Sequence, residues 1–132
     1  MNRSIDNYRA GIAPNPLDIR SIFVLGSLWF DKVNGNTYHR AEVWVDGISI
    51  GYVAAYGYDS MYLQSAAEIL DESGLLPPRE RFPSGTKRSL RTHCRAHGIS
   101  FDSREVKCLK RDLGRWGVNV DAEAVSRLHK GE

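Results

Sequence analysis

The stretch that decides the fold runs from Ile22 to Val45 and reads IFVLGSLWF (22–30), NGN (34–36) and TYHRAEVWV (37–45). Its two outer segments are rich in β-branched and aromatic residues, which favours strands, and the Asn34-Gly35 step favours a tight type I′ turn between them. Apolar residues alternate with polar ones in the second segment. Because successive side chains of a strand point to opposite faces, we expect one face of this segment to meet the core: His39, Ala41, Val43 and Val45.

The residues that follow extend this hairpin into a covered meander. Asp46-Gly47 is a second turn signal, and residues 48–54 predict a third strand. Asp59 or Ser60 can then cap a helix that runs to Ser73 and stops at Gly74. We therefore expect an α+β fold, a three- to four-stranded antiparallel meander covered by one or two helices.

The second half of the chain gives weaker signals. Beyond Pro77-Pro78, a second helix is predicted from Ser84 to His97, with Gly98 at its end. Residues 105–110 alternate like a strand, although helical spacing competes there. We favour a fourth strand at residues 105–110 and leave the helix open as the alternative.

Length and composition fit one domain. The chain has 132 residues, of which 42% are hydrophobic and 26% charged, values that are typical of a globular protein. We expect a flexible N-terminal arm (1–18), a single α+β domain (19–118) and a C-terminal tail or short helix (119–132). With neither a signal-peptide core nor a membrane-length apolar run, we expect a cytoplasmic protein with Cys94 and Cys108 reduced, either a monomer or a homodimer.

Charge is distributed unevenly along the chain. Residues 1–76 carry 5 Lys/Arg and 9 Asp/Glu (−4), whereas residues 77–132 carry 13 and 7 (+6). Basic side chains recur at helical spacing in the predicted second helix and continue beyond it, which predicts a surface for phosphates or for an acidic protein. The competing interpretation is that the basic half packs beside the acidic half. The candidate binding residues are Lys87, Arg88, Arg91, Arg95, Lys107, Lys110 and Arg111.

Two other groups of residues are candidates for a binding site. His93 and His97 could share a metal from one helix face, but ligand-like spacing for two more ligands is missing, so we expect two surface histidines, no metal and no cofactor. Tyr56 and Tyr58 flank Gly57 before a helix and could contact a nucleotide or a partner, although core packing at this junction is the favoured interpretation. No phosphate loop, nucleophile elbow or Cys-x-x-Cys pair indicates an enzyme.

One set of motifs resembles a known group of proteins: WFDK (29–32), NGNTYH (34–39), VDG (45–47) and YGY (56–58). They resemble small, uncharacterised proteins encoded by bacteriophages and prophages, over about residues 22–113, with the Gly-Asn-Thr-Tyr-His hairpin as the most specific part. The resemblance implies a phage accessory protein, and we expect an inhibitor that binds a host defence complex such as CRISPR-Cas. The alternatives are a nucleic-acid-binding module that uses the basic half and a sponge for a signalling nucleotide.

Overall fold

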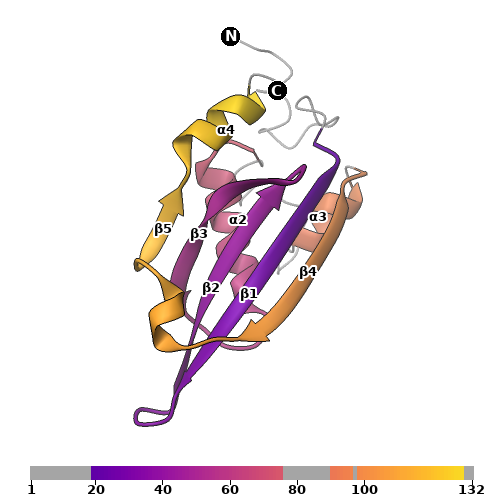
Figure 1. Cartoon of the computed structure of the whole chain (residues 1–132). Coiled ribbons are helices and arrows are strands. Elements are labelled where there is room, and N and C mark those ends of the chain that lie inside the picture. Colours follow the sequence, from indigo (N-terminus) through magenta and orange to yellow (C-terminus); the bar gives the residue numbers. More distant parts are fainter. Residues whose placement is uncertain (1–18, 76–89, 97, 130–132) are drawn as a thin grey trace.

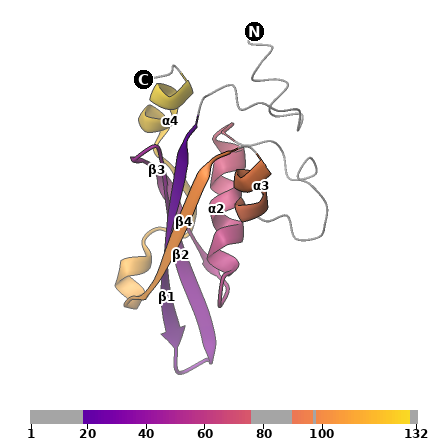
Figure 2. The same ribbon diagram turned by 90° about the vertical axis from the view of Figure 1, so that its right-hand side faces the viewer.

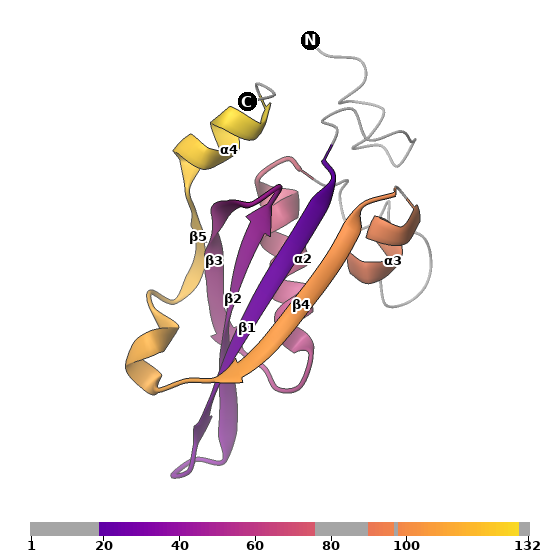
Figure 3. The same ribbon diagram turned by 45° about the vertical axis from the view of Figure 1, so that its right-hand side comes forward.

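The computed structural model describes residues 19–75, 90–96 and 98–129. Within them, five strands form one sheet in the order β4-β1-β2-β3-β5 (Figure 3). The strands are β1 (Ser21–Asp31), β2 (Asn36–Val45), β3 (Ile48–Tyr56), β4 (Ser100–Lys107) and β5 (Gly117–Val120). All neighbouring strands are antiparallel except β1 and β4, which are parallel, so the sheet is mixed.

Helices lie on both sides of this sheet. The helices are α2 (Met61–Glu72), α3 (Leu90–Ala96) and α4 (Ala122–His129), with a short 3-10 helix, η2 (Lys110–Leu113). Helices α2 and α3 cover one face, which we call the covered face, whereas η2 lies against the opposite, open face (Figures 1 and 2). Helix α4 lies at the end of the sheet where β5 finishes (Figure 1).

The predicted meander and its buried face are confirmed. Strand β2 pairs antiparallel with both β1 and β3, with Val24 opposite Val43 and Gly26 opposite Ala41, and the β2–β3 register shifts between Val43 and Trp44. The four residues expected to face the core from β2 are all buried, and Ile69 and Leu70 of α2 pack with them. Alternation along one strand was therefore sufficient to assign its two faces.

The predicted turn types were only half right. Asp46 and Gly47 both have positive φ, 51° and 82°, and Val45 pairs with Ile48, as a two-residue type I′ turn requires. The Asn34-Gly35 prediction was wrong, because Asp31 pairs with Asn36 across a longer loop in which Gly35 is left-handed and Asn34 is not. The Asp31 carboxylate stabilises this loop by accepting hydrogen bonds from the amides of Val33 (3.0 Å) and Asn34 (3.3 Å) and from the Asn34 side chain (2.8 Å).

Helix α2 forms where it was predicted. Ser60 occupies the N-cap position, although its side chain makes no capping hydrogen bond. At the other end Gly74 has a φ of 72°, and the Leu75 amide donates to the Leu70 carbonyl at 2.9 Å, which closes the helix in a Schellman arrangement. For the predicted second helix, α3 is its described part, and Gly98, with a φ of 68°, follows it as expected.

The sheet exceeds the expected meander in two ways. The fourth strand spans residues 100–107 instead of 105–110, and it pairs parallel with β1; the helical alternative for this segment is wrong. The helical connection after β3 returns the chain along the covered face to the outer edge of β1, which permits the parallel pairing. Strand β5 was not anticipated, because Gly-Val-Asn-Val is too short to show a period of its own.

The predicted boundary between residues 118 and 119 falls inside β5, and Leu128 of α4 belongs to the core cluster. The predicted arm, residues 1–18, lies outside the described residues. Cys94 and Cys108 are both free, and burial raises the pKa of the Cys94 thiol to about 12. Of the helices that the structure describes, none has the length and apolar character needed to cross a membrane.

Candidate binding face

The open face of the sheet carries aromatic side chains in place of a helical cover. Strand alternation places one set of side chains from β1, β2 and β3 on this face. They are Phe23, Leu25, Ser27, Trp29, Tyr38, Arg40, Glu42, Trp44, Tyr52, Ala54 and Tyr56.

Three of these rings meet a fourth, that of Trp116, at the hairpin end of the sheet. Together they define the aromatic cluster: Trp29, Tyr38, Tyr56 and Trp116. Tyr38 is at its centre, stacked on Trp29 (centroids 5.6 Å apart, planes at 24°) and edge-on to Tyr56 (5.6 Å) and Trp116 (5.9 Å). Trp29, Tyr38 and Tyr56 are directly opposite one another on β1, β2 and β3. Tyr56 and Trp116 are 52% and 60% exposed, so the cluster presents ring surface to solvent.

The segment around η2 holds Trp116 in the cluster. Leu113 is buried, and its carbonyl accepts a hydrogen bond from the Arg40 guanidinium at 3.4 Å. The Arg115 amide donates to the Tyr52 hydroxyl at 2.8 Å. These contacts fix the chain on both sides of Gly114 and so position the ring of Trp116.

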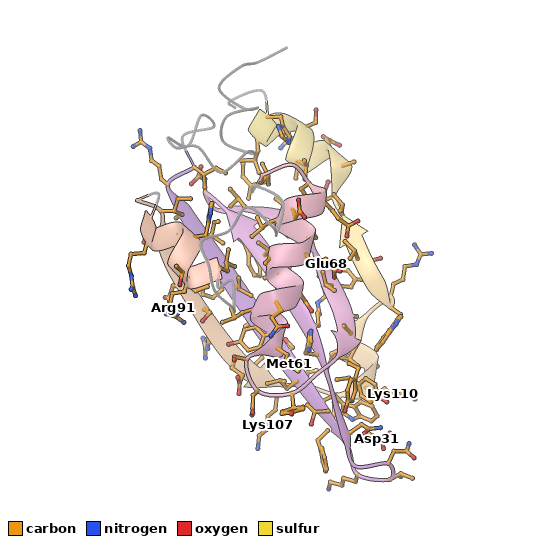
Figure 4. All side chains as sticks on the ribbon, turned by 180° about the vertical axis from the view of Figure 1, so that it is seen from behind. Asp31, Met61, Glu68, Arg91, Lys107 and Lys110 are labelled. Atoms are coloured by element: carbon orange, nitrogen blue, oxygen red, sulfur yellow. The ribbon has the colours of Figure 1, made fainter. Side chains whose placement is uncertain are left out.

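Two cationic groups lie near rings of the open face, one of them beside a ring of the aromatic cluster. The Lys110 ammonium lies 5.7 Å from the centroid of the Trp29 ring, and the Arg40 guanidinium lies 3.6 Å from that of Tyr52. Arg111 and Arg115 are exposed nearby in the sequence. The Asp31 pKa is lowered, chiefly by the Asn34 side-chain hydrogen bond and in smaller part by Lys110. The side chains of Asp31 and Lys110 lie at the same end of the molecule (Figure 4).

The predicted basic residues that the structure describes are divided between the two sides of the sheet. Arg91 and Arg95 are exposed on α3, which lies on the covered face. Lys107 of β4 pairs with Leu28 of β1, and both side chains also belong to the covered face. Lys110 and Arg111 belong to η2 on the opposite side, and Figure 4 shows Arg91 and Lys110 far apart. Lys87 and Arg88 lie outside the described residues.

The two predicted tyrosines are separated in the same way. Tyr56 belongs to the aromatic cluster, whereas Tyr58 lies in the turn before α2 and is 56% exposed. The favoured interpretation, core packing of both rings, was wrong, because each is more than half exposed.

The histidine pair also differs from expectation. His93 is 1% exposed, so the surface interpretation is wrong for it, and His97 lies outside the described residues. Among the residues that the structure describes, no group of three or more His, Cys, Asp and Glu side chains could hold a metal ion.

His39 supports the site from the covered side. Its Nδ1 lies 3.2 Å from the Gly57 carbonyl oxygen, which can only accept, so Nδ1 donates and Nε2 accepts from the Ser65 hydroxyl at 2.7 Å. Burial lowers the His39 pKa, and the Gly57 hydrogen bond offsets part of that shift. The imidazole therefore joins β2, α2 and the turn between Tyr56 and Tyr58.

Sequence reasoning missed Trp29, Trp116 and Arg40 as site residues. One signal was available, because Tyr38 alternates with core residues and so lies on the face away from the core. Comparison with models of protein families, with curated proteins and with solved structures gave no match.

Proposed function

We propose that this chain is a binding protein that takes single-stranded nucleic acid on the aromatic cluster of its open sheet face. The observation that carries the proposal is the half-exposed ring surface of Tyr56 and Trp116 around Tyr38. Every base has a π-face that can stack on such rings, at about 1–3 kcal/mol per base. Lys110, Arg111 and Arg115 supply cations for the phosphates beside those bases.

Two tyrosines provide a matched test. Tyr56→Ala removes a ring of the cluster, whereas Tyr58→Ala removes an equally exposed ring outside it. We expect Tyr56→Ala to weaken binding of a labelled single-stranded oligonucleotide about tenfold, because one stack is lost, and Tyr58→Ala to bind like the wild type. Fluorescence anisotropy at low salt measures both, with duplex of the same sequence as competitor.

Either of two results would remove the proposal. One is the absence of binding by the wild-type protein at low salt, and the other is equal loss in the two tyrosine variants. Circular dichroism of each variant shows that it is folded.

A second pair of variants locates the phosphates. Lys110→Glu should weaken binding and reduce its salt dependence, whereas Lys107→Glu, on the covered side, should change neither. If Lys107→Glu or Arg91→Glu has the larger effect, the nucleic acid lies on the helix side, as the sequence alone suggested.

A protein partner is the second candidate, and the β1–β2 hairpin favours it. This hairpin projects beyond the other strands (Figures 1 and 3), and its end exposes Phe30 (54%) and Val33 (90%). The hydrogen bonds to Asp31 pre-organise the loop, which lowers the entropic cost of docking. A pre-organised tip that exposes Phe30 and Val33 among polar residues suits a phage inhibitor that inserts it into a host defence complex.

Co-purification with a host nucleic-acid-targeting complex tests this candidate. Val33→Asp should abolish capture, whereas Val120→Asp, at an exposed valine at the far end of the sheet, should retain it.

A single nucleotide could also stack on the aromatic cluster. Thermal stabilisation by mononucleotides or cyclic nucleotides, without oligonucleotide binding, would identify a nucleotide sponge instead.

A further inference from the structure

The outer edge of β4 offers backbone hydrogen-bonding groups to a partner. Among the described residues, no strand pairs with this edge. The amides of Ser100 and Cys108 donate to the carbonyls of Arg20, just before β1, and of Leu28 in β1, each at 2.8 Å. Because backbone groups alternate in direction along a strand, the odd-numbered residues turn theirs outward: Phe101, Ser103, Glu105 and Lys107.

Charges along β4 restrict what can pair there. Asp102 pairs with Phe23 and Arg104 pairs with Leu25, so both charged side chains belong to the open face. Glu105 pairs with Gly26 and belongs to the covered face. Charged side chains on an edge strand oppose indiscriminate pairing. Here both signs alternate, so a partner with the complementary pattern is accepted while others are rejected.

We propose that β4 pairs antiparallel with β4 of a second copy of this chain, with Ser103 opposite Ser103 of the partner subunit. Two identical antiparallel strands are related by an axis perpendicular to the sheet, so residues of the same face must be opposite one another. In this register each Asp102 is opposite Arg104 of the partner subunit, twice across the axis.

Neighbouring registers are unfavourable. A shift in one direction places Asp102 opposite Asp102 of the partner subunit, and a shift in the other places Arg104 opposite Arg104 of the partner subunit. Like charges directly opposite each other destabilise a strand pair. The charge pattern therefore selects the Ser103 register among those with extensive overlap.

The covered face adds a second complementary contact. The Ser103 register places Phe101 opposite Glu105 of the partner subunit. The Arg91 guanidinium lies 5.1 Å from the centroid of the Phe101 ring, so it is available to that carboxylate. The two open faces then lie on the same side of one continuous sheet.

Pairing also requires an exchange of hydrogen bonds. The Ser103 amide donates to the Asp102 carboxylate at 2.8 Å. In the dimer this amide donates to the Ser103 carbonyl of the partner subunit, and the Asp102 carboxylate is released for its new arginine. Because an existing bond is exchanged, we expect a weak dimer whose population rises with concentration.

Charge reversal with rescue tests the register. In sedimentation velocity over a concentration series, we expect the wild-type protein to dimerise, Arg104→Asp to remain monomeric, and Asp102→Arg with Arg104→Asp to dimerise again. A wild-type protein that is monomeric throughout, or an Arg104→Asp variant that dimerises like the wild type, overturns the proposal. Circular dichroism confirms that the variants fold.

Cross-linking provides an independent readout in a Cys108→Ser background. Residues in a hydrogen-bonded antiparallel pair have Cα atoms about 5.5 Å apart, within the range of a disulfide. Ser103→Cys should therefore form a disulfide-linked dimer on mild oxidation, whereas Val106→Cys, which would be opposite Ser100 of the partner subunit and leaves the Asp102 and Arg104 pairs intact, should not. Equal cross-linking of the two variants also overturns the proposal, and neither experiment depends on nucleic acid.

Discussion

His39 is one of the few buried polar side chains of the described core, and its two ring nitrogens make different contacts. Nδ1 donates a hydrogen bond to the Gly57 carbonyl and, in the neutral ring, Nε2 accepts one from the Ser65 hydroxyl. Its strand neighbour Tyr38 lies on the other face of the sheet, where it belongs to the aromatic cluster. We interpret His39 as a positioning residue for the turn that carries Tyr56.

Folding stability should depend on pH through His39. Its pKa in the folded chain is below the ordinary value of 6.5, because burial disfavours the charged ring. As pH falls below about 6.5, the unfolded chain takes up a proton that the folded chain does not, so the free energy of unfolding decreases until the folded pKa is reached. Urea unfolding at pH 8, 7, 6 and 5 should show this decrease.

His39→Gln is the matched variant for that measurement. Glutamine keeps a polar side chain but cannot titrate, so the decrease between pH 7 and pH 5 should become shallower. An unchanged pH dependence would show that groups other than His39 cause it.

The contact between β1 and α2 depends on a glycine. A Cβ at Gly26 would lie 2.5 Å from the Tyr62 ring, which packs directly on the strand backbone. This close approach holds α2 against the middle of the sheet, beside the pair of His39 and Leu28. Only the residue without a side chain permits it.

Gly26→Ala should therefore destabilise the fold by about 1–3 kcal/mol through overpacking. Adding Tyr62→Leu, which removes the ring, should cost less than the sum of the two single changes, and urea unfolding of the four proteins measures this coupling. If Gly26→Ala unfolds like the wild type, the ring does not pack there in solution.

Elements with a strong local pattern could be predicted from the sequence. Strand β2 was assigned with its correct faces, because its alternation lies within ten residues. Helix α2 was predicted with its stop at Gly74 for the same reason. The hairpin loop was not, because the Asp31 side chain outweighs the turn preference of Asn34-Gly35.

The whole molecule depends on contacts that no local pattern reveals. The basic half was expected to act as one surface, but β4 and β5 lie at opposite edges of the sheet and η2 lies on its open face. Its charges are therefore divided between both sides. Trp116 joins Tyr38 only through this arrangement, so the aromatic cluster could not be predicted as a unit.

The end of the described chain is part of the core. Leu128 is 7% exposed and belongs to the core cluster, whereas Arg127 is exposed and paired with Glu123 at 3.1 Å. Leu128→Ala should lower the free energy of unfolding by about 2–4 kcal/mol, and Arg127→Ala by less than about 0.5 kcal/mol. Urea unfolding that shows equal small effects would instead support a loosely attached tail.

The parallel pairing of β1 with β4 also has a consequence for folding kinetics. Ser21 pairs with Ser100, so β1 acquires its second neighbour only after the helical connection is in place. Pairing of such distant residues is slow, because loop closure must precede it. During synthesis the β1–β2 hairpin can form early, but the other edge of β1 stays available to foreign strands until β4 has left the ribosome. This interval is when the chain is most exposed to aggregation.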